Sequence, residues 1–322
     1  MKEIGGYFGL EDLKNNEYYS DLIAVNNARN ALVYVLKAKQ IKKLYIPYFL
    51  CDSVEGACKR EGFLFEYYHI DKSLLPIFDK ELLEGEYLYV VNYFGQLSED
   101  KIRELKNRYG RVILDNVQAF FQRPLKGIDT VYSCRKFFGV PDGGYVSTDV
   151  TLNEKIPLDV SMDRMKHTLG RYEGKSAGEY YSDFKANDAS FKELELRYMS
   201  RLTHNIMGAV DYDSVCKKRE ENFLALHSAL GGINKIDVKT PIGPYAYPLY
   251  LENGMEIKRE LAKKGIFVPT LWPNVLDMNC TLEKDYAENI LPLPVDQRYD
   301  KEDMERVINE LIKYIKTENK GA

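Results

Sequence analysis

The feature that most constrains the fold is the alternation of short apolar runs with helical patterns through the first half of the chain. Helical spacing of apolar residues occupies residues 27–41 and 98–110, where Ser98 and the acidic residues after it form a capping box. Apolar runs typical of buried strands lie at residues 42–49, 86–94, 111–120 and 129–134. Strands joined by such helices form a parallel sheet, because the crossover between parallel strands is a helix. We therefore predict an α/β fold.

The second half of the chain differs from the first in its composition and in its pattern of apolar residues. Residues 150–200 are polar and rich in Tyr, Lys and Asp, and we expect a connecting or covering segment there. A helical pattern over residues 198–232 ends at a glycine pair and links two lobes. The remainder reads as a small α+β lobe, with strands at 247–252 and 267–272 and helices at 256–266 and 300–318. We predict a large domain over residues 1–205 and the linking helix with a small domain over residues 206–322.

Length and charge exclude several classes of function. The chain has 322 residues, 45% of them hydrophobic, which is enough for a large core. Lys and Arg total 45 against 49 acidic residues, so no basic surface for nucleic acid or a membrane is indicated. No apolar run approaches the roughly 20 residues that cross a bilayer, and the first residues lack an apolar signal core. We expect a cytoplasmic protein.

Cysteine and histidine usage does not indicate a metal or disulfide framework. The five cysteines are scattered without C-x-x-C spacing, and the four histidines are equally dispersed. We expect reduced thiols and no metal.

Candidate chemistry lies just after the strands, because ligands bind at the carboxyl ends of strands in such sheets. Asp115 follows a buried run, where an ionised carboxylate needs a cation or strong donor beside it. Gln118 comes three residues later, and Lys136 follows the next strand beside Arg135. A lysine amine becomes a nucleophile when partly desolvated or near another cation. A carboxylate and such a lysine on neighbouring strand ends match pyridoxal phosphate, which needs a lysine for covalent binding and an acid at its ring nitrogen.

Each of these residues also has a purely structural interpretation. Lys136 is a solvated loop cation in that interpretation, and Asp115 is a helix N-cap after a strand. Residues 141–145, PDGGY, then form a simple hairpin turn.

Several segments resemble those of the DegT/DnrJ/StrS-type sugar aminotransferases. Residues 115–120, DNVQAF, resemble the family's D-x-x-Q-A segment. Residues 136–146, KFFGVPDGGYV, resemble its K-x-x-x-x-G-E-G-G-x-V segment, with Asp142 in place of the usual Glu. Further likenesses follow in order at residues 26–32, 45–54, 91–96, 246–251, 261–273 and 291–311. The resemblance implies a fold-type-I pyridoxal phosphate enzyme, with a large domain around a mainly parallel sheet and a small C-terminal α+β domain.

The resemblance also implies roles at the cofactor ring. Lys136 would bind pyridoxal 5'-phosphate covalently and then shuttle a proton. Asp115 would hold the ring nitrogen, and Gln118 would lie near the phenolic oxygen. An aromatic side chain normally covers the ring face, but strict alignment places Cys51 there, so Tyr48 or Phe49 would take over.

At the phosphate end, the resemblance implies that Ala28 and Arg29 open a helix whose first amides bind the phosphate, with Ser133 as a further donor. Leu196 stands where the neighbouring subunit of the family commonly supplies an asparagine, so either Arg197 substitutes or that contact is lost.

The function that the resemblance implies is an aminotransferase that moves an amino group from an amino acid, such as glutamate, to a keto group of a nucleotide-linked sugar. The resemblance also implies a homodimer. Two alternatives stay open. One is a cofactor-binding homologue that is non-catalytic or regulatory, and the other is a carbohydrate-binding scaffold.

Overall fold

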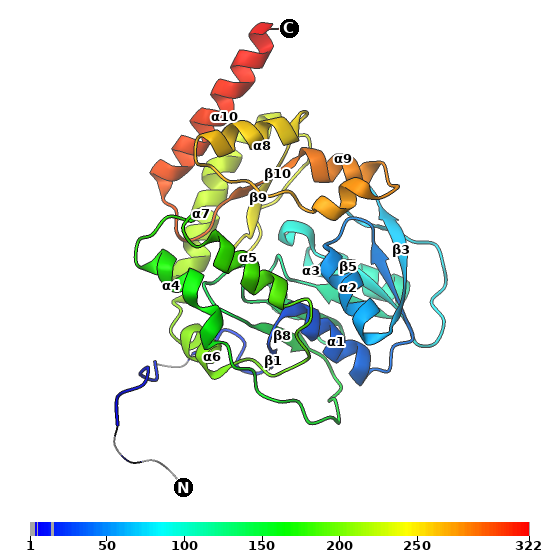
Figure 1. Cartoon of the computed structure of the whole chain (residues 1–322). Helices are drawn as coiled ribbons and strands as arrows, with labels where there is room; N and C mark the ends of the chain where they lie inside the picture. Colours follow the sequence, from blue (N-terminus) through cyan, green and yellow to red (C-terminus); the bar gives the residue numbers. More distant parts are fainter. Residues whose placement is uncertain (1–3, 5, 14–15, 322) are drawn as a thin grey trace.

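A mixed sheet forms the centre of the molecule. The computed structural model describes residues 4, 6–13 and 16–321. The larger of the two sheets among these residues has the strand order β1-β8-β7-β6-β5-β2-β3-β4 (Figure 1). Its strands are β1 (Ile23–Val25), β2 (Lys43–Pro47), β3 (Leu64–Ile70), β4 (Pro76–Ile77), β5 (Glu86–Val91), β6 (Val112–Asp115), β7 (Asp129–Ser133) and β8 (Gly144–Ser147). Five neighbouring strands of this sheet are parallel to one another, in the order β7, β6, β5, β2 and β3. Strands β1, β4 and β8 pair antiparallel with their neighbours.

Helices form three of the crossovers between parallel strands, as the sequence predicts, whereas the chain from β6 to β7 and from β3 to β5 contains no helix. The crossovers contain α1 (Ala28–Ala38), α2 (Asp52–Glu61), and η1 (Tyr93–Gly95) with α3 (Glu99–Tyr109). The predicted cap at Ser98 is confirmed, because its side chain accepts a hydrogen bond from the Lys101 amide. Asn27 caps α1 in the same way through the Asn30 amide. The predicted α/β fold with a mainly parallel sheet is therefore confirmed.

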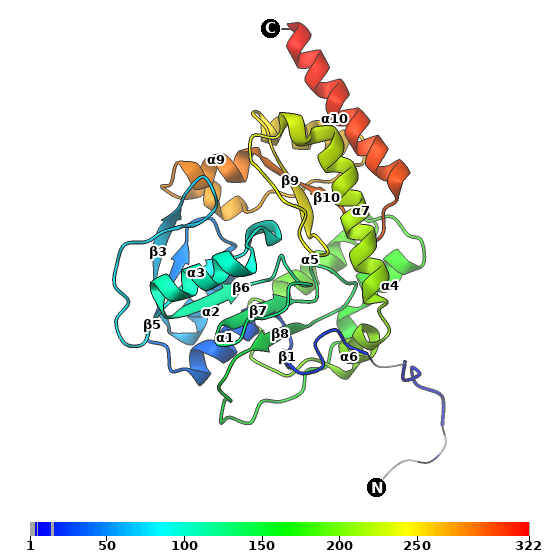
Figure 2. The ribbon, with the colours of Figure 1, turned by 180° about the vertical axis from the view of Figure 1, so that it is seen from behind.

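The C-terminal part has its own core. Two antiparallel strands, β9 (Ala246–Tyr250) and β10 (Ile290–Pro294), pack with helices around a separate hydrophobic cluster that includes Phe223 and Leu311. Figure 2 shows α7 running from the large sheet up to this part, with α10 beyond it. The helices here are α7 (Tyr212–Leu230), η3 (Gly231–Ile233), α8 (Gly254–Lys263), η4 (Pro273–Asp277), α9 (Leu282–Asn289) and α10 (Lys301–Gly321).

Two details of the sequence prediction are wrong. Residues 267–272 are not a strand; instead Leu271 and Trp272 are buried against the main core, and Trp272 packs on Phe49. The partner of β9 is β10, which the sequence analysis did not predict as a strand because its two prolines argue against one. The helical pattern over residues 198–232 divides into α6 (Arg201–Gly208) and α7, because Asp211 caps a new helix by accepting from the Ser214 amide.

The polar segment after β8 folds over the start of α1. It contains η2 (Met162–Arg164), α4 (Lys166–Tyr172) and α5 (Tyr181–Ser190). In Figure 1 these helices lie between α1 and the C-terminal helices. The Asn30 side chain donates to the carbonyls of Leu194 and Glu195, which fixes the end of this segment against α1.

Candidate functional site

Asp115 ends β6 as a buried carboxylate. It is 3% exposed and accepts hydrogen bonds from the Tyr89 hydroxyl at 2.7 Å and the Val117 amide at 2.9 Å. Burial raises the pKa of Asp115, while Val117, Tyr89 and the charge of Lys136 act in the opposite direction. The structural interpretation of Asp115 as an N-cap does not hold, since no helix begins here. A cationic group beside Asp115 would favour the ionised carboxylate.

Gln118 carries an unused hydrogen-bond donor next to Asp115. Its Oε1 accepts from the Phe94 amide at 2.8 Å, which fixes the orientation of the side-chain amide. Its Nε2 is buried and has no partner among the described residues. A buried N–H without a partner costs free energy, so this donor fits a ligand oxygen.

Lys136 follows β7 on the strand next to Asp115. Its side chain is half-buried, and Nζ forms no hydrogen bond or ion pair within the part of the chain that the structure describes. The nearest recorded contact is the ring of Tyr245, whose centre lies 5.3 Å from Nζ. Tyr245 was not identified from the sequence. The amine is therefore held near a buried carboxylate without a competing partner.

Two side chains from the C-terminal half hold the loop that carries Lys136. The Phe137 carbonyl accepts from Arg219 Nη2 at 3.1 Å and from Gln297 Nε2 at 2.8 Å. Arg219 is 1% exposed, donates also to Pro244, and stacks on the Phe137 ring at 4.6 Å. Sequence reasoning missed both residues, because Arg219 lies in a charged run typical of a solvated helix face.

The predicted phosphate residues gather where β8 meets the start of α1. Ser133 pairs with Gly144 in the sheet, and a Cβ at Gly144 would lie 2.8 Å from the main-chain carbon of Asn27. Only glycine permits this approach, which places Ser133 close to Ala28 and Arg29 at the first turn of α1. The first-turn amides of α1 and the Ser133 hydroxyl can therefore serve one anion.

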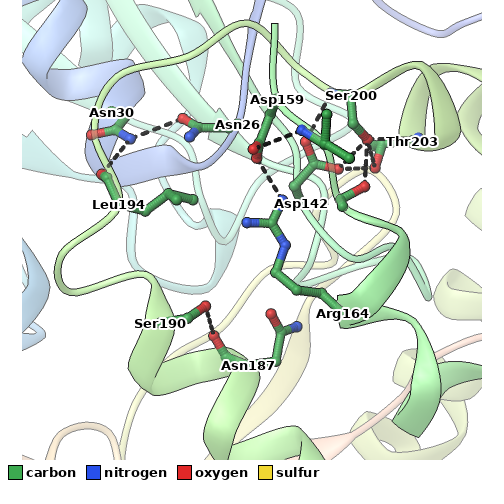
Figure 3. Close-up of polar contacts among 12 residues, drawn as sticks. Asn26, Asn30, Asp142, Asp159, Arg164, Asn187, Ser190, Leu194, Ser200 and Thr203 are labelled. Atoms are coloured by element: carbon green, nitrogen blue, oxygen red, sulfur yellow. Dashed lines mark hydrogen bonds and ion pairs between the residues drawn. The ribbon is translucent and has the colours of Figure 1, made fainter.

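Asp142 has a structural role. The Ser200 amide and hydroxyl donate to it at 2.9 and 2.8 Å, and the Thr203 hydroxyl donates as well (Figure 3). Asp142 thus anchors the start of α6 to the loop between Lys136 and β8.

The two aromatic candidates for the ring face have other partners. Phe49 is fully buried and packs against Tyr93 and Trp272. Tyr48 is half-buried and stacks on Tyr67 and His69 of β3, with ring centres 4.7 and 4.6 Å away. Both rings thus already pack against other aromatic side chains. Cys51 precedes α2 and is half-buried.

Arg197 lies beside the start of α1, since its carbonyl accepts from the Asn26 amide at 2.9 Å. Its Nε is buried and has no partner among the described residues.

Two features are missing from the part of the chain that the structure describes, residues 4, 6–13 and 16–321. Within them, no cluster of three or more His, Cys, Asp or Glu side chains is arranged to hold a metal ion. No helix in this part of the chain has the length and apolar character needed to cross a membrane.

Comparisons with known proteins identify the fold. No family model and no curated protein matches the sequence. Solved structures do: the sugar aminotransferase CalS13 from Micromonospora echinospora has 16% identity and a TM-score of 0.61, covering 90% of this chain and 86% of its own. A DegT DnrJ EryC1 StrS aminotransferase from Brucella abortus has 15% identity and a TM-score of 0.60, with 91% and 85% covered. NtdA from Bacillus subtilis, solved with bound cofactor PMP, has 17% identity and a TM-score of 0.65, with 92% and 73% covered. The chain therefore has the fold of these aminotransferases, as the sequence resemblance implied.

Proposed function

We propose that this chain is a pyridoxal phosphate-dependent aminotransferase that moves an amino group from an amino acid, such as glutamate, to the keto group of a sugar. The observation that carries the proposal is the arrangement of Asp115, Gln118 and Lys136 on adjacent strand ends. There a buried carboxylate lies close enough to an unpaired amine to be affected by its charge, and an unpartnered amide donor follows three residues after the carboxylate. The fold shared with sugar aminotransferases supports it. A nucleotide-linked sugar is the acceptor that we propose from the sequence resemblance.

The residues present fit the cofactor. Pyridoxal phosphate, when bound, withdraws electrons from the carbon that carries the amino group. Asp115 would hold the positive charge at the ring nitrogen, and Gln118 Nε2 would donate to the ring oxygen. Lys136 would hold the cofactor covalently and, once released as a free amine, would take up and return the proton.

The phosphate would lie at the start of α1. The first amides of α1, at Ala28 and Arg29, and the Ser133 hydroxyl would donate to it, and the positive end of the helix dipole would favour its charge.

The assembly follows from the same resemblance. We propose a homodimer, because the family that the chain resembles builds each site from two subunits. We also propose the cytoplasm as its location.

Borohydride reduction of the protein loaded with pyridoxal phosphate tests the assignment of Lys136. Reduction fixes the cofactor on the amine that holds it, and peptide mass spectrometry then locates the label. We expect the label on Lys136, its loss in Lys136→Ala, and its retention in Lys106→Ala. Lys106 is a useful control because burial lowers its pKa, which makes its amine a candidate for unspecific labelling.

Other outcomes would change the proposal. A label on another lysine would overturn the role of Lys136. A label on Lys136 without amino transfer from any amino acid would support the non-catalytic homologue. No binding of the cofactor at all would favour the carbohydrate-binding scaffold.

A further inference from the structure

Three aromatic rings stack on the face of β3 that contacts α2. Tyr67 bonds to α2, and His69 points to the same face because it lies two residues further along the strand. The ring of Tyr48, which follows β2, stacks on both. Its centre lies 4.7 Å from that of Tyr67 and 4.6 Å from that of His69, with interplanar angles of 15° and 26°. The rings therefore form one flat-sided aromatic group.

Two carboxylates fix the orientation of these rings. The Tyr67 hydroxyl donates to Glu55 of α2 at 2.8 Å. His69 Nδ1 lies 2.9 Å from Oε1 of Glu283 in α9, which is 1% exposed and also accepts from the Ile70 amide at 3.0 Å. An ionised carboxylate only accepts hydrogen bonds, so Nδ1 carries the proton and donates it. Because the side chains are already ordered, a ligand that binds them loses little conformational entropy.

His69 keeps an open face although its ring is held. Its side chain is 51% exposed, while Tyr48 covers one face and Glu283 bonds Nδ1. Nε2 forms no hydrogen bond with any residue that the structure describes. Ile77 of β4 stands directly opposite His69 in the antiparallel pair and is 57% exposed. Directly paired side chains lie on one face of a sheet, so Ile77 extends the open surface. We call His69, Tyr48 and Ile77 the His69 platform.

The platform lies at the edge of the sheet where Asp115 and Lys136 lie. Strand β3 is the third strand from β6 in the order β6-β5-β2-β3, and these strands are parallel. With about 4.8 Å between neighbouring strands, β3 and β6 are about 14 Å apart. Figure 1 shows β3 at the outer side of the sheet, with α9 above it. A ligand that reaches both places must be extended and must end in a flat group.

We propose that the His69 platform binds the base of a nucleotide-linked acceptor. A nucleobase stacks through its flat faces on aromatic side chains, as it does in proteins that bind single-stranded nucleic acid. A bare sugar needs several hydrogen-bond partners, whereas this surface offers one free polar atom, Nε2 of His69. The diphosphate that joins base and sugar spans the distance to Lys136. The inference rests on the proposed function for its use of the nucleotide, but binding of the base needs neither cofactor nor amino transfer.

Calorimetry on the full chain without cofactor tests the platform, with uridine, deoxythymidine and guanosine diphosphates as probes. For the nucleotide that binds best, we expect His69→Ala to weaken binding about tenfold and His69→Phe, which keeps a flat ring, to retain most of it. Ile77→Ser should weaken binding about threefold and leaves the contact between His69 and Glu283 in place. The matched control is Tyr172→Ala, an 87% exposed aromatic side chain at the end of α4, far from β3 in Figure 1. Its affinity should be unchanged, and thermal unfolding verifies that each variant is folded.

Two ligands without a base separate the base from the rest of the nucleotide. Pyrophosphate and glucose 1-phosphate should each bind at least about tenfold more weakly than the best nucleotide, with no effect of His69→Ala. Lys136→Ala should bind the nucleotide normally, so the platform and the proposed role of Lys136 can fail independently.

Several results would overturn the platform. They are absence of binding by all three nucleotides, binding of glucose 1-phosphate as tight as that of the best nucleotide, and equal affinity in His69→Ala, Ile77→Ser and the control. A loss in His69→Phe as large as that in His69→Ala would overturn stacking as the mode of binding.

Discussion

Asp115 shows at the scale of one residue how the proposed function competes with stability. Its carboxylate is buried, and its pKa is raised because burial outweighs the donors that face it. A raised pKa in the folded state contributes stability at low pH, and that contribution is lost as pH rises through the folded-state pKa. The ionised carboxylate of Asp115 therefore lowers the stability of the folded protein when no cofactor is bound.

We accordingly predict that Asp115→Asn raises the melting temperature of the cofactor-free protein, and more at pH 8 than at about pH 4, close to the usual aspartate pKa. Asparagine keeps an acceptor for the Val117 amide and loses the charge. The same variant should bind pyridoxal phosphate more weakly, because the ring nitrogen loses its counter-charge. Scanning calorimetry at the two pH values measures the first effect. A lower melting temperature for the variant at pH 8 would contradict this account.

The sequence predicted the residues of the site unevenly. Asp115, Gln118 and Lys136 could be found because each follows an apolar run that ends at one edge of the sheet. Tyr245, Arg219 and Gln297 could not, since they reach the Lys136 loop from distant parts of the chain. The contact between His69 and Glu283 was equally hidden, because 214 positions separate the two residues in the sequence.

At the scale of elements, α7 and the chain after β10 fix the loop that carries Lys136. We predict that Arg219→Ala lowers the free energy of unfolding by about 3 kcal/mol or more. The substitution leaves the Pro244 carbonyl and Gln297 Oε1 without the donor that Arg219 supplies, takes one of two donors from the Phe137 carbonyl, and removes the packing on the Phe137 ring. Gln297→Ala, which removes one donor, should cost about 1 kcal/mol. Urea unfolding measures both. Amide exchange in residues 136–140 should also rise in each variant.

The control for this pair is Lys217→Ala on the same helix. Its side chain is 79% exposed and 4.0 Å from Glu221, so its effect should stay within about 0.5 kcal/mol. Equal stability of Arg219→Ala and the control would show that Arg219 does not hold the loop.

The segment before β1 is tied to α6 by a titratable pair. His204 Nδ1 lies 2.6 Å from Glu17 Oε1, and the Tyr145 hydroxyl donates to the other Glu17 oxygen. The hydrogen bond to Glu17 raises the pKa of His204 despite its partial burial. This stabilisation is complete below the usual histidine pKa of about 6.5 and is lost as pH rises through the raised value.

We predict that residues 16–22 open more readily at pH 8.5 than at pH 6 through loss of this bond. Amide exchange of residues 16–22 is measured for the parent chain and for Glu17→Gln at each pH. Comparing the two chains at the same pH cancels the intrinsic effect of pH on exchange. The parent chain should exchange these amides much more slowly than Glu17→Gln at pH 6 and only slightly more slowly at pH 8.5. A difference between the two chains that does not change with pH would exclude His204 as the titrating group.

The elements themselves follow the sequence where periodicity is strong. The capped helix at α3 and the strands that precede Asp115 and Lys136 could be predicted because their apolar spacing and their end signals agree. Strand β10 could not, because its prolines argue against a strand unless it pairs at an edge. Residues 267–272 look like a strand because Leu271 and Trp272 are buried, but burial here comes from packing on Phe49 and its neighbours.

At the scale of the whole molecule, the boundary at residue 205 stays a prediction. The separate cluster that includes Phe223 and Leu311 supports a second core in the C-terminal part. The proposed homodimer rests on the sequence resemblance, which implies that each site is completed by a second copy of the chain. Arg197, half-buried with its Nε unpartnered, lies at the start of α1 of its own chain.

A homodimer should therefore form at assay concentration, and light scattering should give twice the chain mass of 37.3 kDa. We expect Arg197→Ala to weaken cofactor binding more than dimer formation. A monomer with full activity would refute the assembly.

The visible absorbance spectrum tests the central claim most directly. The protein with pyridoxal phosphate should show the band of the lysine-bound cofactor, and glutamate should convert it to the spectrum of pyridoxamine phosphate. Lys136→Ala should lack the band and lose at least about a hundredfold in activity, as expected for a general acid–base group. A band that persists in Lys136→Ala, or that no amino acid changes in the parent chain, would contradict the assignment of this protein as an aminotransferase that uses Lys136.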